Sequence, residues 1–370
     1  MRKSALLAFG LVVTTLVLLG LVVLSSASEA NAMRYHNGDA YFFMRRQFEY
    51  LAAGVLVFVA VARFDYHKWR DHEFLAWAFF SLVFVLLIAV LFSRAINGSH
   101  RWLAVGPVRL QPSELAKLAV VVLVAVWQDK SGYRVELFTR GALCPAVIIG
   151  MVAAPIMMEP DFGSVMVVGL VGFLVMFVSG TRILHMLPFV VVGAACVAYK
   201  VLTNANRVAR LFDARALYQV NMALAAIGNG GIWGVGLGES MQKQLYLPEA
   251  HTDFVFAVGA EELGIVFSVS VIALFLAFFG LSVYIARKAT DRFGRFLVVG
   301  MTFIIFFQAM FNLGVVCKAL PTKGMALPFF SYGGTNLLCA FFAAGTILSV
   351  GVHSYRDKKH MLARKVLTRV

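Results

Sequence analysis

The chain has 370 residues, of which 61% are hydrophobic and only 14% are charged, and its mean hydropathy is +0.82. This composition excludes a soluble globular protein and indicates an integral membrane protein. The formal net charge of +14 is compatible with a nucleic-acid partner. Whether the basic excess indicates such a partner depends on how the charges are distributed along the chain.

Ten apolar runs with few charges follow one another along the chain, and about 20 such residues cross a bilayer as a helix. We therefore expect an all-α integral membrane protein with about ten transmembrane helices. The eighth run is long enough to include an interfacial turn. The runs are 5–25, 47–64, 74–93, 113–128, 141–158, 163–180, 183–203, 254–286, 296–317 and 331–352.

The basic residues are distributed unevenly between the two sides of this arrangement. If the N-terminus is cytoplasmic, the cytoplasmic segments carry a net charge of +12 and the outer segments +2. Basic residues collect on the cytoplasmic side of membrane proteins, so we expect both termini there. The basic excess then reflects topology and contact with membrane lipids, and we expect no nucleic-acid partner.

We expect one polytopic membrane domain over residues 1–352 and a basic cytoplasmic tail over 353–370, since no Pro/Ser-rich linker divides the sequence. The long segment 204–253 lies between the seventh and eighth helices and faces outward in this topology. Function tends to reside on such a loop. Within it, an apolar stripe over 214–227 predicts a short amphipathic helix at the bilayer interface.

The end of this loop holds the strongest candidate site. Glu249, His251, Thr252 and Asp253 lie directly against the eighth apolar run, where ionisable groups are costly to desolvate and indicate function. Glu261 follows Asp253 at i+8, which would place two carboxylates on neighbouring faces of one helix. Burial and like charge would then raise a pKa and suit a general base, and a divalent cation between acidic groups and an anionic substrate is equally compatible. The alternative is that Asp253 or Thr252 only caps the helix.

Further polar residues lie at the outward ends of other runs. Arg101, beside Trp102, either anchors the chain at the interface or binds a phosphate. Glu114 and Lys117 share one face of an apolar helix, where each charge needs the other or a ligand, and we expect them to line a polar cavity. Asp161 lies in a tight turn, either as a helix cap or as a site residue.

The remaining candidates lie in two outward loops. Lys243 is a cation for anionic lipid or for a pyrophosphate, and the glycines of 228–238 predict turns rather than a dinucleotide fingerprint, which would need a preceding strand. Lys323 is the residue between the last two helices best placed to meet an anion. Ser331 either belongs to the site or allows close backbone approach.

Four separated segments, 98–117, 159–164, 218–264 and 321–338, resemble the signatures of the SEDS family of cell-wall polymerases in the same order and at the same topological places. The sequences of 248–253 and 321–324 are more similar to the division branch of that family than to its elongation branch. The resemblance implies ten transmembrane helices and polymerisation of lipid II into glycan strands at the outer face of the bacterial cytoplasmic membrane, at the division septum.

The resemblance also implies roles for individual residues. Asp253 matches the catalytic aspartate, as a base or a metal ligand, with Mg or Mn as the possible cation and no organic cofactor. The other roles are cavity support for Glu114, Lys117 and Glu261, and pyrophosphate contact for Arg101, Lys243 and Lys323. The implied partners are lipid II, the growing glycan strand, a class B penicillin-binding protein and other division proteins. A lipid II flippase and a non-enzymatic scaffold for a division transpeptidase are the alternatives.

Overall fold

The computed structural model describes residues 3–93, 100–106, 108–159, 161–203, 214–244, 247–321 and 324–367. Each of the ten apolar runs lies largely within a helix, as expected where the bilayer offers backbone groups no partner but one another. The prediction of an all-α membrane fold is confirmed. The helices over these runs are α1 (Lys3–Tyr35), α2 (Phe42–Arg63), α4 (Glu73–Leu91), α5 (Pro112–Ser131), α6 (Cys144–Met158), α7 (Phe162–Ser179), α8 (Ile183–Leu202), α11 (Val255–Lys288), α12 (Arg292–Val316) and α13 (Gly334–Leu367).

Within the described residues, eight helices are long and apolar enough to cross a membrane. Helices α2 and α5 are not among the eight, and each contains four charged side chains. Charges are costly inside a bilayer unless they pair or face the protein interior, and Glu114 and Lys117 of α5 do pair, as described below. The number of ten crossings therefore stays a prediction.

Shorter elements connect these helices, and one of them was not expected. A small antiparallel hairpin, with Leu103 opposite Leu110, precedes α5, although the sequence predicted only helices. Helix α10 confirms the amphipathic helix expected over 214–227. The short elements are α3 (His67–Asp71), β1 (Leu103–Val105), β2 (Val108–Leu110), η1 (Gly132–Glu136), η2 (Phe138–Leu143) and α10 (Ala214–Asn229).

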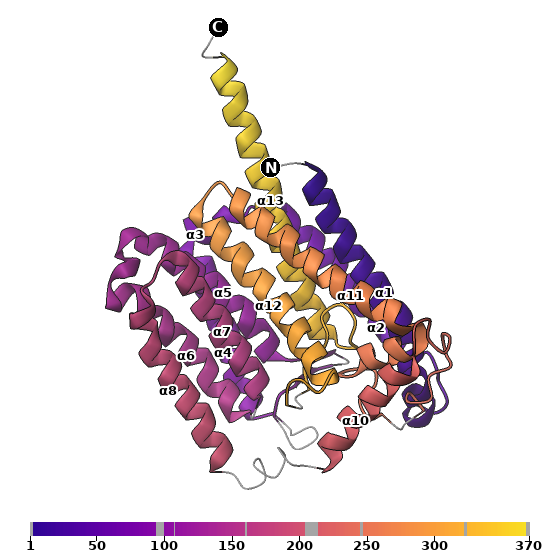
Figure 1. Ribbon diagram of the computed structural model, residues 1–370. Coiled ribbons are helices and arrows are strands. Elements are labelled where there is room, and N and C mark those ends of the chain that lie inside the picture. The colour runs from indigo at the N-terminus through magenta and orange to yellow at the C-terminus, as the bar shows by residue number, and fades with distance from the viewer. Residues whose placement is uncertain are drawn as a thin grey trace.

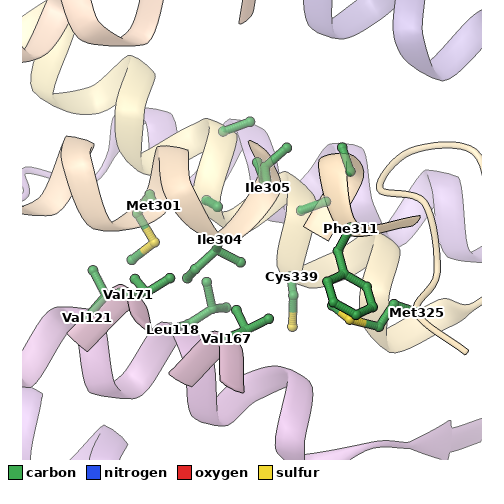
Figure 2. Close-up of a cluster of buried hydrophobic side chains, with 14 of the residues drawn as sticks. Leu118, Val121, Val167, Val171, Met301, Ile304, Ile305, Phe311, Met325 and Cys339 are labelled. Carbon is green, nitrogen blue, oxygen red and sulfur yellow. The ribbon is translucent and has the colours of Figure 1, made fainter. Parts of the chain in front are cut away.

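Helix α5 lies at the centre of the packing. Every residue from Leu118 to Val126 is buried, and the helix packs against α4, α7 and α12. Figure 2 shows the apolar junction, in which Met301 and Ile304 of α12 lie against Leu118 of α5 and Val171 of α7. This core fixes the outer ends of α5, α7 and α12, which carry most of the polar residues considered below.

Figure 1 shows the start of α1 and the end of α13 at one end of the bundle, with α10 at the opposite end. The charge distribution assigns the first end to the cytoplasm. The large loop and the candidate residues around Asp253 then lie at the outer end.

Helix α11 is interrupted near its outer end, which agrees with the turn expected in the eighth apolar run. Gly264 has φ +73 and ψ −165, and the segment after α10 packs against the helix there, with the Ile265 N–H donating to the Gly231 carbonyl over 3.0 Å. Gly230 allows this approach, because a Cβ at that position would overlap the Ala260 carbonyl oxygen. The glycines therefore serve a close contact between the loop and α11.

Candidate functional site

The turn of residues 249–253 holds the candidate base. Glu249 has a left-handed φ of +58, which bends the chain so that its carbonyl accepts hydrogen bonds from the N–H groups of Thr252 and Asp253, each over 3.1 Å. The Thr252 hydroxyl donates to the exposed Glu249 carboxylate over 2.8 Å. The turn is therefore built from its own backbone and leaves the Asp253 carboxylate to interact elsewhere.

The capping alternative for Asp253 and the helical spacing expected between Asp253 and Glu261 are both wrong. Helix α11 begins at Val255, with Phe254 in the cap position and no side-chain capping bond, so neither Asp253 nor Thr252 caps it. Asp253 also lies before the first residue of the helix, so the i+8 spacing does not place its carboxylate and that of Glu261 on neighbouring faces of one helix. The turn at Glu249, which local spacing could not reveal, holds Asp253 outside the helix.

The Asp253 side chain is partly buried beside Gly324, where a Cβ would overlap its Oδ2 atom. Its backbone carbonyl accepts a hydrogen bond of 2.8 Å from Asn312 Nδ2 of α12. Burial and, to a smaller extent, the Glu249 charge raise the pKa of Asp253 to about 7, against the Arg101 charge. A carboxylate with this pKa can act as a general base near neutral pH.

Arg101 connects Asp253 with the turn between α6 and α7. Its Nε donates to the Glu159 backbone carbonyl over 3.2 Å. The Glu159 carboxyl is fully buried, and neither oxygen has a hydrogen-bond partner among the described residues. Burial and the Asp161 charge raise the pKa of Glu159 to about 8, against the Arg101 charge. Glu159 is therefore largely protonated at pH 7.

His251 joins the turn to three other segments. Its ring lies 4.7 Å from that of Phe43 of α2, its Nδ1 lies 3.4 Å from Asn31 Nδ2 of α1, and its carbonyl accepts the Tyr332 N–H over 2.9 Å. Burial lowers the pKa of His251, which the Glu249 charge opposes. The imidazole is therefore predominantly neutral at pH 7.

Glu114 and Lys117 form a buried ion pair of 2.7 Å on α5. Lys117 Nζ also donates to Gln308 Oε1 of α12 over 3.0 Å. The two charges thus satisfy each other and the Gln308 amide, and their place in a ligand cavity stays a prediction.

Asp161 caps α7, which was the first of the two roles considered for it. It accepts hydrogen bonds from the Ser164 hydroxyl over 2.7 Å and from the Ser113 hydroxyl of α5 over 3.2 Å. Ser331 likewise closes a turn, since its hydroxyl accepts the Leu327 N–H over 2.7 Å. Lys323 lies outside the described residues.

Lys243 and Glu261 belong to a second buried cluster. Lys243 Nζ donates to the Ser26 hydroxyl of α1 over 2.9 Å and lies 3.6 Å from the Glu262 carboxylate. Glu261 accepts a hydrogen bond from the Ser240 hydroxyl. The structure therefore places both residues in a junction of α1, the large loop and α11. Asp253 is not among the described partners of either residue.

Within the described parts of the chain, no group of three or more His, Cys, Asp or Glu is placed to hold a metal ion. Mg²⁺ is usually bound by one or two carboxylates together with substrate phosphates. The carboxylates of Asp253 and Glu249 fit a site of this kind, in which substrate phosphates supply the other ligands. They do not make a metal site from protein groups alone.

The sequence did not single out Asn312, Gly324 or the unpartnered carboxyl of Glu159. Asn312 offered one signal, since an amide inside an apolar run needs a hydrogen-bond partner. Gly324 offered none, because only the fold brings it to Asp253.

Comparison with known protein families agrees with this arrangement. The family of FtsW, RodA and SpoVE, described as "Cell cycle protein", matches residues 6–356. A probable peptidoglycan glycosyltransferase FtsW of Geobacter metallireducens is 36% identical over 349 residues, which cover 92% of each chain. Stage V sporulation protein E of Bacillus subtilis is 35% identical over 356 residues, covering 93% of this chain and 96% of the relative.

Solved structures show the same fold. A chain from a peptidoglycan synthase complex that coordinates polymerization and crosslinking matches with a TM-score of 0.73 and 25% identity, covering 94% of this chain and 98% of the other. The rod shape determining protein RodA of Thermus thermophilus matches with a TM-score of 0.68 and 27% identity, covering 94% and 96%.

Proposed function

The chain belongs to the SEDS family of FtsW, RodA and SpoVE proteins, and from that premise we propose that it is a peptidoglycan glycosyltransferase. It polymerises lipid II into glycan strands at the outer face of the bacterial cytoplasmic membrane, during septal wall synthesis. Relatives that carry the FtsW name support the division role.

The observation that carries this proposal is the environment of Asp253. Its pKa of about 7 leaves a substantial ionised fraction at neutral pH, and the Arg101 charge acts on the same carboxylate. A base and a cation that come together from two outer loops suit transfer of a sugar from a pyrophosphate-linked donor.

In the proposed reaction, the acceptor 4-hydroxyl loses its proton to the Asp253 carboxylate as its oxygen attacks the anomeric carbon of the donor sugar. The bond between that carbon and the lipid-linked pyrophosphate breaks, and the pyrophosphate leaves with the bonding electrons. Arg101 stabilises the negative charge on the leaving group. Lys323 is a further candidate for that contact.

A divalent cation, Mg or Mn, belongs to the alternative role of Asp253, as a metal ligand in place of the base. Asp253 and Glu249 would hold it together with phosphate oxygens of the substrate. When bound, it would neutralise charge on the pyrophosphate.

We also propose that a class B penicillin-binding protein crosslinks the strands that this chain makes. The structural likeness to a chain of a complex that coordinates polymerization and crosslinking supports this partner. Other division proteins would recruit the pair to the septum.

Asp253→Asn tests the function. The amide is nearly isosteric with the acid but cannot accept the acceptor proton, and loss of a general base typically costs about 10²–10⁴-fold in rate. Purified protein with its cognate penicillin-binding protein should polymerise lipid II, read as product length on a gel, and Asp253→Asn should not. Asp39→Asn, which changes an outer carboxylate paired with Arg45, is the control and should remain active.

The control and the alternatives have distinct outcomes. An active, stable Asp253→Asn protein would remove this carboxylate from the chemistry. Transport of lipid II across proteoliposomes without polymer, under conditions that activate the complex, would favour the flippase.

A further inference from the structure

Helix α12 places two amide side chains one turn apart beneath the outer loops. Gln308 and Asn312 are only 3% and 2% exposed. A buried amide is costly unless its groups are hydrogen-bonded, so the partners of these two amides show what they hold.

Asn312 holds two backbone segments together. Its Nδ2 donates to the carbonyl of Asp253 over 2.8 Å and to the carbonyl of Met325 over 2.6 Å. Met325 follows Gly324, the residue whose missing Cβ leaves room for the Asp253 carboxylate. One amide nitrogen thus fixes both the turn that carries the candidate base and the segment that this base lies against.

Gln308 holds the next carbonyl of the same segment. Its Nε2 donates to the Ala326 carbonyl over 3.1 Å and to Asn336 Oδ1 of α13 over 3.2 Å. Its Oε1 accepts from Lys117 Nζ, which is paired with Glu114. The consecutive carbonyls of 325 and 326 are therefore tied to α12, and through Gln308 to the buried ion pair of α5.

We propose that Asn312 is a positioning residue for Asp253. Together with Gln308, it sets the register of residues 324–326 against the 249–253 turn, and so sets where the carboxylate points. The inference rests on the proposed function for its catalytic consequence, but its structural consequence can be measured without any activity.

Asn312→Ala removes both donors and frees the two segments from each other. A displacement of about 1 Å of a reacting group can cost about 10²-fold in rate. We expect kcat for lipid II polymerisation to fall about 10–100-fold, while KM changes less than about threefold because the Asn312 side chain is buried and bonds to backbone carbonyls. Hydrogen exchange should become faster in residues 247–258 and 324–327.

Gln128→Ala is the matched control. Gln128 is a fully buried amide on α5 whose Nε2 donates to the Gly141 carbonyl over 2.9 Å, at the opposite end of that helix. Its loss should lower the melting temperature comparably but leave kcat and exchange in the two outer segments unchanged. Asn312→Ser keeps one donor and should lie between wild type and Asn312→Ala, and it replaces the alanine variant if that protein does not fold.

Wild-type exchange in both segments of the Asn312 variants would overturn the inference. A rise in KM at constant kcat, or a kcat loss equal to that of Gln128→Ala at equal melting temperature, would do the same. If the wild-type complex makes no polymer, the proposed function fails, and the exchange measurement still decides whether Asn312 positions the turn.

Discussion

Asp253 gives the clearest pH signature at the level of single residues. A base must be ionised to accept a proton, and the pKa of Asp253 is about 7, so the polymerisation rate should rise about tenfold per pH unit below pH 7 and level off above it. An ordinary aspartate would give a flat profile between pH 5 and 8.

Glu249→Gln checks the cause of this profile. It removes the like charge that raises the pKa of Asp253, so the midpoint should move to lower pH. Initial rates at saturating lipid II, measured in buffers of constant ionic strength, would show both effects. A midpoint that does not move would argue against Asp253 as the titrating group.

Glu159 makes a prediction about stability. Its pKa is raised from 4.5 to about 8 in the folded protein, so the folded state binds the proton more tightly than the unfolded state. The contribution of the protonated Glu159 carboxyl to the free energy of unfolding is therefore fully present below pH 4.5 and is lost as the pH rises towards 8. At pH 7 the loss is about 3 kcal/mol, since each pH unit above 4.5 costs ~1.4 kcal/mol.

Glu159→Gln mimics the protonated form and cannot ionise. We expect the variant to be more stable than wild type at pH 7 to 8 and equally stable near pH 4.5, which melting temperatures in detergent would show. A constant difference across that range would mean that Glu159 does not titrate in it.

The residue types of the candidate turn were predictable, but their contacts were not. Ionisable groups at the start of an apolar run identify Asp253 from local sequence. Asn312 and Gly324 reach it from 59 and 71 positions away, and their contacts depend on how α12 packs. Lys243 was a plausible partner for an anion, yet it pairs with α1, which no local pattern could indicate.

At the level of elements, the junction between the large loop and α11 depends on Gly230. This glycine is required for lack of space and not for its backbone conformation, since its φ is not left-handed. A Cβ at Gly230 would overlap the Ala260 carbonyl oxygen, which is backbone and cannot move aside. Gly230→Ala should therefore lower the melting temperature and accelerate exchange in residues 230–236 and 260–265.

Gly228→Ala is the control for this variant. It lies two positions earlier, in α10, and a Cβ there meets nothing within 4 Å. Alanine is favoured over glycine within a helix by about 0.5–1 kcal/mol, so Gly228→Ala should be neutral or stabilising. Equal behaviour of the two variants would contradict the packing described for α11.

The helices themselves were readily predictable, because long apolar runs in a bilayer have few other choices of structure. Their ends were less so. Helix α11 begins at Val255 because the Glu249 turn intervenes, and the β1–β2 hairpin is too short to leave a periodic signal.

At the scale of the whole molecule, the start of α1 and the end of α13 share one side of the bundle and α10 lies on the other (Figure 1). The fold alone does not say which side is cytoplasmic. That assignment comes from the net charges of +12 and +2, because basic segments are retained in the cytoplasm. The fold therefore shows which segments share a side of the membrane, and the sequence shows which of the two sides is cytoplasmic.

Cysteine labelling tests the orientation. In a background without Cys144, Cys196, Cys317 and Cys339, single cysteines at Glu239 and Arg356 would both be exposed. An impermeant maleimide applied to intact cells, with the outer membrane permeabilised where present, should label Glu239→Cys and spare Arg356→Cys until the cells are lysed. Ser240→Cys is the control for burial, since Ser240 is fully buried next to Glu239, and it should react only after denaturation. Labelling of Arg356→Cys with protection of Glu239→Cys would place the Asp253 turn in the cytoplasm, where polymerisation at the outer face could not use it.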